Sequence, residues 1–139
     1  MTVASALALV APAGATAAVT ISVPARADLT AKILVTVPVT ITCGPYEQAL
    51  AGTSVSVSIE QATSKGIARG SAFRGGFMDP TFALTCDGSA HAYPIAITAD
   101  PAGPPFKNGS AIVSASAFVS FDCCTGDTAS AGPQPIKLN

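Results

Sequence analysis

Charged residues are scarce in this sequence. Lys, Arg, Asp and Glu together make up 11% of its 139 residues, whereas a typical soluble domain has about 25%. The seven basic and eight acidic residues nearly cancel and form no blocks. A nucleic-acid surface needs clustered Lys and Arg to displace counterions, so nucleic acid is excluded as a partner and an anionic membrane surface is disfavoured. With little charge to keep copies apart, a surface rich in Ser, Thr and Ala permits self-association.

Residues with catalytic or metal-binding chemistry are equally few. His91 is the one histidine, no CxxC spacing occurs, and the glutamates are Glu47 and Glu60. A zinc site needs Cys and His donors at such spacings, and glycosidic chemistry needs two acids facing each other across a cleft. Asp87, Ser89 and His91 lie close in sequence, but catalytic triads are assembled from separate elements around an oxyanion hole. We therefore predict a turn followed by a strand here, no catalytic, cofactor-binding or metal residues, and a protein that is not an enzyme.

The N-terminal segment is apolar but short. Residues 3–10 form an apolar run that is too short to span a bilayer, which takes about 20 residues. Small residues follow, with an A-x-A-like site at residues 15–17, the pattern at which export signals are cleaved. We predict that residues 1–18 are a signal peptide. No Lys or Arg precedes the apolar run, so we expect the natural signal to begin upstream of Met1.

The mature chain is then expected to start near Ala18 or Val19 and to form a single domain over residues 19–139. It is expected to be secreted, and to be extracellular or associated with the cell wall. Two alternatives remain open. In the first, cleavage occurs at a second A-x-A site, residues 25–27, and removes a plausible first strand. In the second, the N-terminal segment is an Ala-rich disordered tail that is not cleaved.

Apolar and polar residues alternate along the rest of the chain, as they do in half-buried β-strands. The alternation is clearest over residues 29–43, where every odd position is apolar, so we expect one long strand there. Pro38 has no N–H to donate and predicts a break, a bulge or an edge. Further strands are expected at residues 19–23, 54–59, 67–73, 81–86, 91–99, 111–123 and 134–138. Seven or eight strands without a helix predict an all-β, antiparallel sandwich, with a small closed barrel as the alternative.

Four short motifs follow one another along the mature chain. They are TC at 42–43, VSVSI at 55–59, CDGSAH at 86–91 and PFKNGSAIVSA at 105–115. Together they resemble a family of small secreted actinobacterial domains of unknown function with a predicted immunoglobulin-like sandwich. The resemblance extends over nearly all of the mature chain. It implies a secreted immunoglobulin-like sandwich with a Cys43–Cys86 disulfide, and it implies no activity. The adjacent Cys123 and Cys124 depart from the family's pattern.

Four cysteines in a small exported chain are expected to be oxidised, and four allow three pairings. Cys43 and Cys86 each end the inward row of an expected strand, which favours a bridge between them across the core. Cys123 and Cys124 would then form a vicinal disulfide, whose eight-membered ring is strained and easily reduced. Crossed pairings, free thiols and intermolecular bonds remain the alternatives.

The most unusual loop extends from residue 73 to residue 82 and places three Phe, one Met and one Arg around two adjacent glycines. One interpretation is a hairpin connection whose aromatic rings fold back over the end of the core. The other is an exposed apolar patch for a partner or ligand, with Phe73, Arg74, Phe77 and Met78 as the candidate interaction residues.

Phe82 keeps the alternation with Leu84 and Cys86 and is expected to point inward, whereas the two residues after the glycines keep no register and are expected to be at least partly exposed. Outward positions Leu34, Ile112 and Phe118 raise a related question, because they place large apolar groups on a sheet face that would otherwise meet water.

These observations favour an exported, non-enzymatic β-sandwich module for protein interaction, surface structure or self-assembly, whose partner is an unknown protein or its own copies. In one version, residues 19–23 are donated as a strand to a neighbour's open sheet edge. The alternative is a small carrier of apolar ligands, like the immunoglobulin-like apoproteins that hold reactive chromophores. A deep apolar cleft would favour a carrier, and a flat apolar face would favour assembly.

Overall fold

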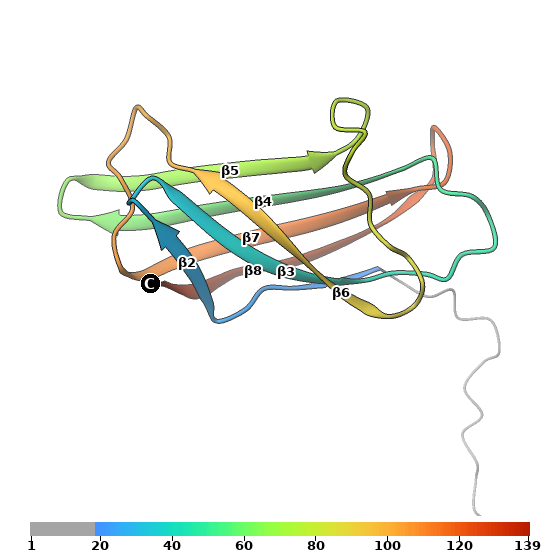
Figure 1. Ribbon diagram of the computed structural model, residues 1–139, viewed down its shortest axis with the longest axis horizontal. Helices are drawn as coiled ribbons and strands as arrows, with labels where there is room; N and C mark the ends of the chain where they lie inside the picture. The colour runs from blue at the N-terminus through green and yellow to red at the C-terminus, as the bar shows by residue number, and fades with distance from the viewer. Residues whose placement is uncertain (1–18) are drawn as a thin grey trace, which may run out of the picture.

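The structure is a computed structural model that describes residues 19–139 (Figure 1). The predicted signal peptide, residues 1–18, lies outside the described residues. Within residues 19–139 the secondary structure consists of eight strands and no helix, so no helix there is long and apolar enough to cross a membrane. The strands are β1 (Thr20–Ser22), β2 (Arg26–Thr30), β3 (Leu34–Thr42), β4 (Gly52–Thr63), β5 (Gly66–Gly75), β6 (Ala90–Thr98), β7 (Gly109–Ser120) and β8 (Gly126–Leu138).

The strands form two layers. Hydrogen bonds connect them in the order β1-β3-β2-β8-β7-β4-β5, with β6 added to β3. Figure 1 shows β2, β3 and β6 crossing in front of β5, β4, β7 and β8. Strand β2 joins the layers, because Arg26 and Ala27 pair in parallel with β8 while the residues after them pair antiparallel with β3. The remaining strand pairs are antiparallel. The prediction of an all-β, antiparallel sandwich of seven or eight strands is confirmed, and the arrangement is consistent with its immunoglobulin-like form.

The core lies between the layers and is built from the apolar rows of alternating strands. Successive side chains of a strand point to opposite faces, so each apolar row is directed at the other layer. Phe106, in the segment between β6 and β7, is the largest fully buried side chain. The buried rows are Val35, Val37, Val39 and Ile41 on β3, Val55, Val57 and Ile59 on β4, Ile95 and Ile97 on β6, and Ala111, Val113, Ala115, Ala117 and Val119 on β7.

The long strand expected at residues 29–43 is two strands joined by a hairpin turn. Leu29 pairs with Val35 across β2 and β3, and the turn between them has left-handed backbone at Ala31 (φ 53°) and Lys32 (φ 64°). Paired residues point to the same face, and exactly six positions separate Leu29 from Val35. The turn therefore keeps odd positions inward on both strands, and the alternation continues across it without a visible break.

Pro38 lies in the middle of β3, opposite Pro94 of β6. On its other side β3 pairs with β1 at Thr40–Thr42 and with β2 at Leu34–Thr36, and Pro38 falls in the gap between these two pairings. The missing N–H of Pro38 therefore removes no bond to β1 or β2, which is the local edge that the sequence predicts.

The strand expected at residues 81–86 does not form. This segment is an irregular connection from β5 to β6, although Leu84 is buried in the core. Its backbone is held by side chains instead of a strand ladder: the N–H of Leu84 donates to Thr53 Oγ1 (3.0 Å) and the N–H of Thr85 donates to Tyr93 Oη (2.8 Å). The other expected strands lie within β1, β4, β5, β6, β7 and β8, apart from shifts at their ends.

Candidate interaction surface

The loop that the sequence singles out begins where β5 ends. Gly75 and Gly76 have left-handed backbone (φ 97° and 71°), which an L side chain rarely adopts. Gly75 is buried against the backbone of Thr53, where a Cβ atom would collide with the Thr53 carbonyl. These two glycines turn the chain sharply away from the sheet, so that the following residues leave the sandwich.

An ion pair closes the base of this loop. Arg74 Nε donates to Asp79 Oδ2 at 2.6 Å, and Thr81 Oγ1 donates to Asp79 Oδ1 at 2.9 Å. The hydrogen bond from Arg74, followed by that from Thr81, lowers the pKa of the Asp79 carboxyl below its ordinary value. The guanidinium carbon of Arg74 also lies 5.1 Å from the centre of the Phe82 ring, a cation–π distance. Arg74 thus connects the start of the loop to Asp79 and Phe82 near its end.

Phe82 points inward, as the sequence predicts. It is partly buried against the core, and its ring meets that of Tyr93 edge to face, with centroids 5.8 Å apart. This geometry is a favourable one for aromatic pairs. Phe82 therefore belongs to the end of the core.

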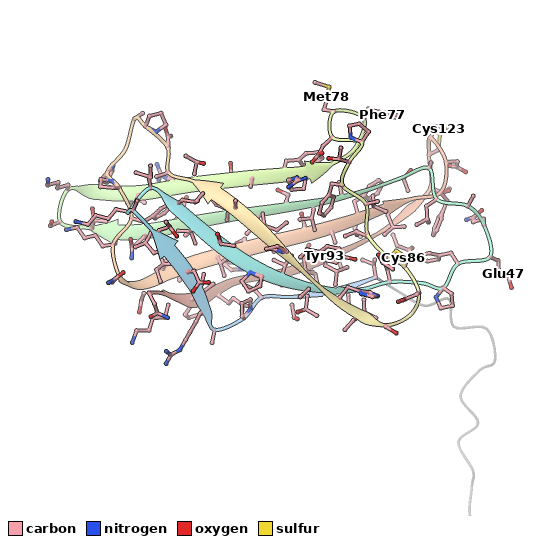
Figure 2. All side chains as sticks on the ribbon, viewed as in Figure 1. Glu47, Phe77, Met78, Cys86, Tyr93 and Cys123 are labelled. Carbon is pink, nitrogen blue, oxygen red and sulfur yellow. A yellow bond between two sulfur atoms is a disulfide. The ribbon has the colours of Figure 1, made fainter. Side chains whose placement is uncertain are left out.

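Phe77 and Met78 project from the tip of the loop into solvent. Their exposed fractions are 102% and 94%, and Phe73 on β5 is 62% exposed. Figure 2 shows Phe77 and Met78 together at one end of the molecule, on the side of β5. Of the four candidate interaction residues, the structure thus exposes the three apolar ones in one region and assigns Arg74 to holding the loop.

The outer face of the β5-β4-β7-β8 layer continues from Phe73. Cross-strand partners on one face form rows, and two rows consist largely of serine. We call the face that they form the serine face. Its rows are Ser71, Ser58 and Ser114, and Phe73, Ser56, Ser116 and Ser130.

Large apolar side chains border the serine face at both ends. Phe118 pairs with Ser54 next to the second serine row, and Ile112 pairs with Glu60 at the other end; both are exposed, as is Ile67 on β5. The ring of Phe118 lies over Gly126 of β8. The sequence predicts the outward positions of Ile112 and Phe118. It gives no such signal for Ile67, which stands at the start of a weakly alternating strand.

One ion pair lies on the serine face. Arg69 Nε and Glu60 Oε1 are 3.1 Å apart on the neighbouring strands β5 and β4, and both side chains are largely exposed. The same two residues border a surface hollow of about 550 Å³ between β4, β5 and the end of β6, together with Ser58, Ser71, Thr98 and Asp100. Apolar residues (Ile59, Ala99 and Pro101) lie beside these polar ones, and the hollow is open to solvent, so it is not the deep apolar cleft that a carrier needs.

Cys43 and Cys86 form a disulfide, with 4.5 Å between their Cα atoms and a sequence separation of 43. It links the end of β3 to the irregular segment before β6. Next to it, the N–H of Gly88 donates to the carbonyl of Cys43 (2.8 Å). This bridge fixes the second end of the segment that carries Phe82 and Leu84.

The expected vicinal disulfide is absent, and the prediction is corrected: Cys123 and Cys124 are exposed free thiols. The turn that holds them explains the difference. Asp122 Oδ1 accepts the N–H groups of Cys124 and Thr125, both at 2.7 Å, and these bonds stabilise a turn without the strained ring that adjacent cysteines must close. Hydrogen bonds from Cys124 and Thr125 lower the pKa of Asp122, and the neighbouring Cys123 thiol raises the pKa of the Cys124 thiol.

His91 does not take part in a triad. Its Nε2 lies 2.9 Å from Asp87 Oδ1, which also accepts the backbone N–H of Ser89 (2.9 Å). The hydrogen bond with His91, followed by that with Ser89, lowers the pKa of Asp87. The Ser89 hydroxyl makes no hydrogen bond to His91 among the described residues. The arrangement is a capped turn before β6.

Comparison with known proteins assigns no family. No protein-family model matches the chain, and no curated protein matches its sequence. Among solved structures, the solution structure of CsgH from R. palustris is similar at 16% identity and a TM-score of 0.39, over 83% of this chain and 92% of that one. The sporulation control protein Spo0M from Bacillus subtilis is similar at 15% identity and a TM-score of 0.40, over 89% of this chain. The chain spans 49% of Spo0M. Membership of the actinobacterial family stays a prediction.

Proposed function

We propose that this chain is an exported, non-enzymatic β-sandwich module that works by binding a protein partner or further copies of itself. The observation that carries the proposal is the exposure of Phe73, Phe77 and Met78 in one region, next to the serine face. Apolar groups gathered on a surface and rimmed by polar residues are typical of protein interaction sites.

The serine face suits a packing surface because it carries almost no net charge. Arg69 and Glu60 offset each other, and the neighbouring outward residues are mainly serine. Serine side chains are short, so a partner can approach the sheet closely over this area. Exposed Phe73 and Phe118 on either side of β4 provide apolar contacts at its border.

Association by this face is favoured over strand exchange at a sheet edge. Strand β1 pairs with β3 of its own chain, and Val19 before it is buried in the core, so this segment already has a place in its own sandwich. Pro94 occupies the middle of β6, which pairs on one side with β3, and a proline cannot donate a ladder hydrogen bond to an added strand. The bridge between Gly70 and Ala99 occupies part of the edge of β5.

The carrier hypothesis is the weaker one. The hollow beside β5 is open to solvent and is bordered by the exposed Glu60–Arg69 ion pair, whereas a carrier encloses most of its apolar ligand in a deep cleft.

Export is part of the proposal. A disulfide between Cys43 and Cys86 is typical of proteins from oxidising compartments. The intact mass of the exported protein should correspond to a chain that starts near Ala18 or Val19. An exported form that retains Met1 would contradict processing at this site.

The test of function is a comparison of self-association. Sedimentation velocity of the wild type over a range of concentrations should show reversible oligomers, and the variant Phe77→Ser, Met78→Ser should be shifted to monomer. The matched control is Ile33→Ser, because Ile33 is also exposed (55%) but lies in the β2–β3 turn at the opposite end of the layers from the β5 loop (Figure 1). If the wild type is a monomer, the same variants are compared for capture of surface proteins from the producing cells. Equal behaviour of wild type and loop variant in both assays would refute the proposal.

A further inference from the structure

A second cluster of chemically distinctive residues lies in the loop between β7 and β8. Asp122, Cys123 and Cys124 are all exposed, and one carboxylate oxygen and both Sγ atoms lie within 4.8 Å of one another. The loop is at the same end of the molecule as Phe77 and Met78 (Figure 2). The apolar interaction surface makes no use of these groups.

The backbone that carries the cluster is held at both ends of the loop. The N–H of Phe121 donates to the carbonyl of Thr125 (3.0 Å), and Ser120 Oγ donates to the carbonyl of Asp122 (2.7 Å). The Phe121 ring packs edge to face against Tyr46, with centroids 4.9 Å apart. The loop is thus anchored to the sheet and to the segment before β4, while its thiols face outward. Preorganised ligands of this kind bind a metal with less loss of conformational entropy.

We propose that Asp122, Cys123 and Cys124 bind one thiophilic divalent cation of the Zn²⁺ or Cd²⁺ type. Two thiolates and one carboxylate oxygen complete three positions of a tetrahedral site, and water takes the fourth. Thiolate donors select such cations over Mg²⁺ and Ca²⁺, which prefer oxygen ligands.

The geometry is compatible with a single ion. Zn–S and Zn–O bonds of about 2.3 and 2.1 Å place ligand atoms roughly 3.5–4 Å apart around one ion, which small side-chain rotations reach from the observed arrangement. Asp122 Oδ1 accepts two backbone N–H groups, and Oδ2 makes no hydrogen bond among the described residues, so it remains available to the ion. Asp127, three residues after Cys124, adds a second negative charge to this part of the chain.

The sequence predicts no metal site at these residues because adjacent cysteines lack the CxxC spacing. In that spacing, one turn brings separated sulfurs together. Here the Asp122-capped turn brings adjacent ones together with the carboxylate. The sulfurs of Cys123 and Cys124 can either bind an ion or form a vicinal disulfide. Binding an ion avoids the strain of the eight-membered disulfide ring.

The test is a titration of the full chain with Cd²⁺. Binding is monitored by the thiolate-to-cadmium charge-transfer absorption in the ultraviolet. The protein is first treated with a mild reductant until thiol titration counts two thiols per chain, which shows that the Cys43–Cys86 bridge is intact. One ion per chain should bind. Cys123→Ser and Cys124→Ser should each remove most of the absorption and weaken binding by at least about tenfold, and Zn²⁺ should compete for the site.

Asp122→Asn separates ligation from folding of the turn, because the Asn carbonyl still accepts the two N–H groups while the negative charge is lost. It should weaken Cd²⁺ binding without a change in melting temperature of the metal-free chain. Asp100→Asn is the matched control, since Asp100 Oδ1 caps a similar turn by accepting the N–H of Ala102 (2.9 Å). The assignment is overturned if the reduced wild type binds no ion, if binding survives both Cys→Ser changes, if one ion binds per two chains, or if Asp122→Asn and Asp100→Asn behave alike.

Discussion

The two halves of the β5–β6 connection should respond in opposite ways to mutation. The side chains of Phe77 and Met78 are almost entirely exposed. Replacing both by Ser therefore removes no buried apolar contact, and surface substitutions of this kind change the free energy of unfolding by no more than about 0.5 kcal/mol. The melting temperature should move by about 2 °C or less.

Phe82→Ala should behave differently. The Phe82 ring is partly buried against the core, meets Tyr93 edge to face and lies beneath the Arg74 guanidinium. Its truncation loses transfer free energy, the aromatic pair and the cation–π contact together. We expect a loss of about 2–3 kcal/mol, which is below the usual range for a core phenylalanine because Phe82 is only partly buried.

Urea unfolding of the oxidised chain measures the change in free energy of unfolding for both variants. The transition is monitored by tyrosine fluorescence and far-ultraviolet circular dichroism. Tyr93→Phe serves as a control for changes in the fluorescence signal. A loss of more than about 1.5 kcal/mol in Phe77→Ser, Met78→Ser would place these side chains in the core, and the candidate surface would lose its apolar centre. A Phe82→Ala variant as stable as the wild type would refute the division of the loop.

Three further predictions concern the frame around this surface. Cys43→Ala with Cys86→Ala should lower the free energy of unfolding by about 2–5 kcal/mol in a urea titration, because a bridge over 43 residues constrains the unfolded chain. The pKa of Asp79, lowered by Arg74 and Thr81, should be measured by NMR below its ordinary value of about 3.9; its contribution to stability is complete above that value and is lost as the pH falls through the lowered pKa. Replacing Ala31 by Asn and Lys32 by Gly should stabilise the chain by about 1 kcal/mol, because both residues have left-handed φ that Asn and Gly adopt more readily.

Each of these three predictions has a control. Non-reducing peptide mapping that links Cys43 to Cys123 would contradict the core bridge. In Asp79→Asn, the decrease in the free energy of unfolding at acidic pH should lose the Asp79 contribution. An unchanged pH dependence would show that the Arg74–Asp79 ion pair contributes nothing to stability. Lys65→Gly places the same change in the β4–β5 turn, where φ is not left-handed, and should destabilise the chain by roughly 0.5–1 kcal/mol; stabilisation there as well would refute the argument from φ.

The sequence predicts most of the sandwich because burial enforces a period of two. Val55, Val57 and Ile59 alternate with serine and glutamate, and the structure places all three in the core, where the polar Thr53 and Gln61 extend their row at its two ends. The same alternation continues from β2 into β3, so the sequence does not predict the turn between them. Ala31 and Lys32 carry no turn signal, because left-handed backbone usually selects Gly, Asn or Asp, and the turn length preserved the alternation. Only pairing between strands, which depends on the whole fold, distinguishes one long strand from a hairpin of this length.

The segment around Leu84 shows the opposite limit. Phe82, Leu84 and Cys86 alternate as a strand would, and Leu84 is buried, but the backbone bonds go to the side chains of Thr53 and Tyr93. Alternation reports which side chains face the core, and it does not report what pairs with the backbone. The Cys86 disulfide and the hydroxyl groups of Thr53 and Tyr93 hold this segment in place of a neighbouring strand. The local sequence does not predict these contacts.

The candidate surface was predictable in part for a related reason. Two glycines followed by residues out of register indicate a loop that leaves the sheet, so the exposure of Phe77 and Met78 follows from local sequence. The serine face does not, because its rows exist only through the register of β4 against β5 and β7. An outward serine is unremarkable in one strand. Six serines in two cross-strand rows, bordered by Phe73 and Phe118, make a flat and nearly neutral area. That area gives the apolar loop beside it a surface against which a partner can pack.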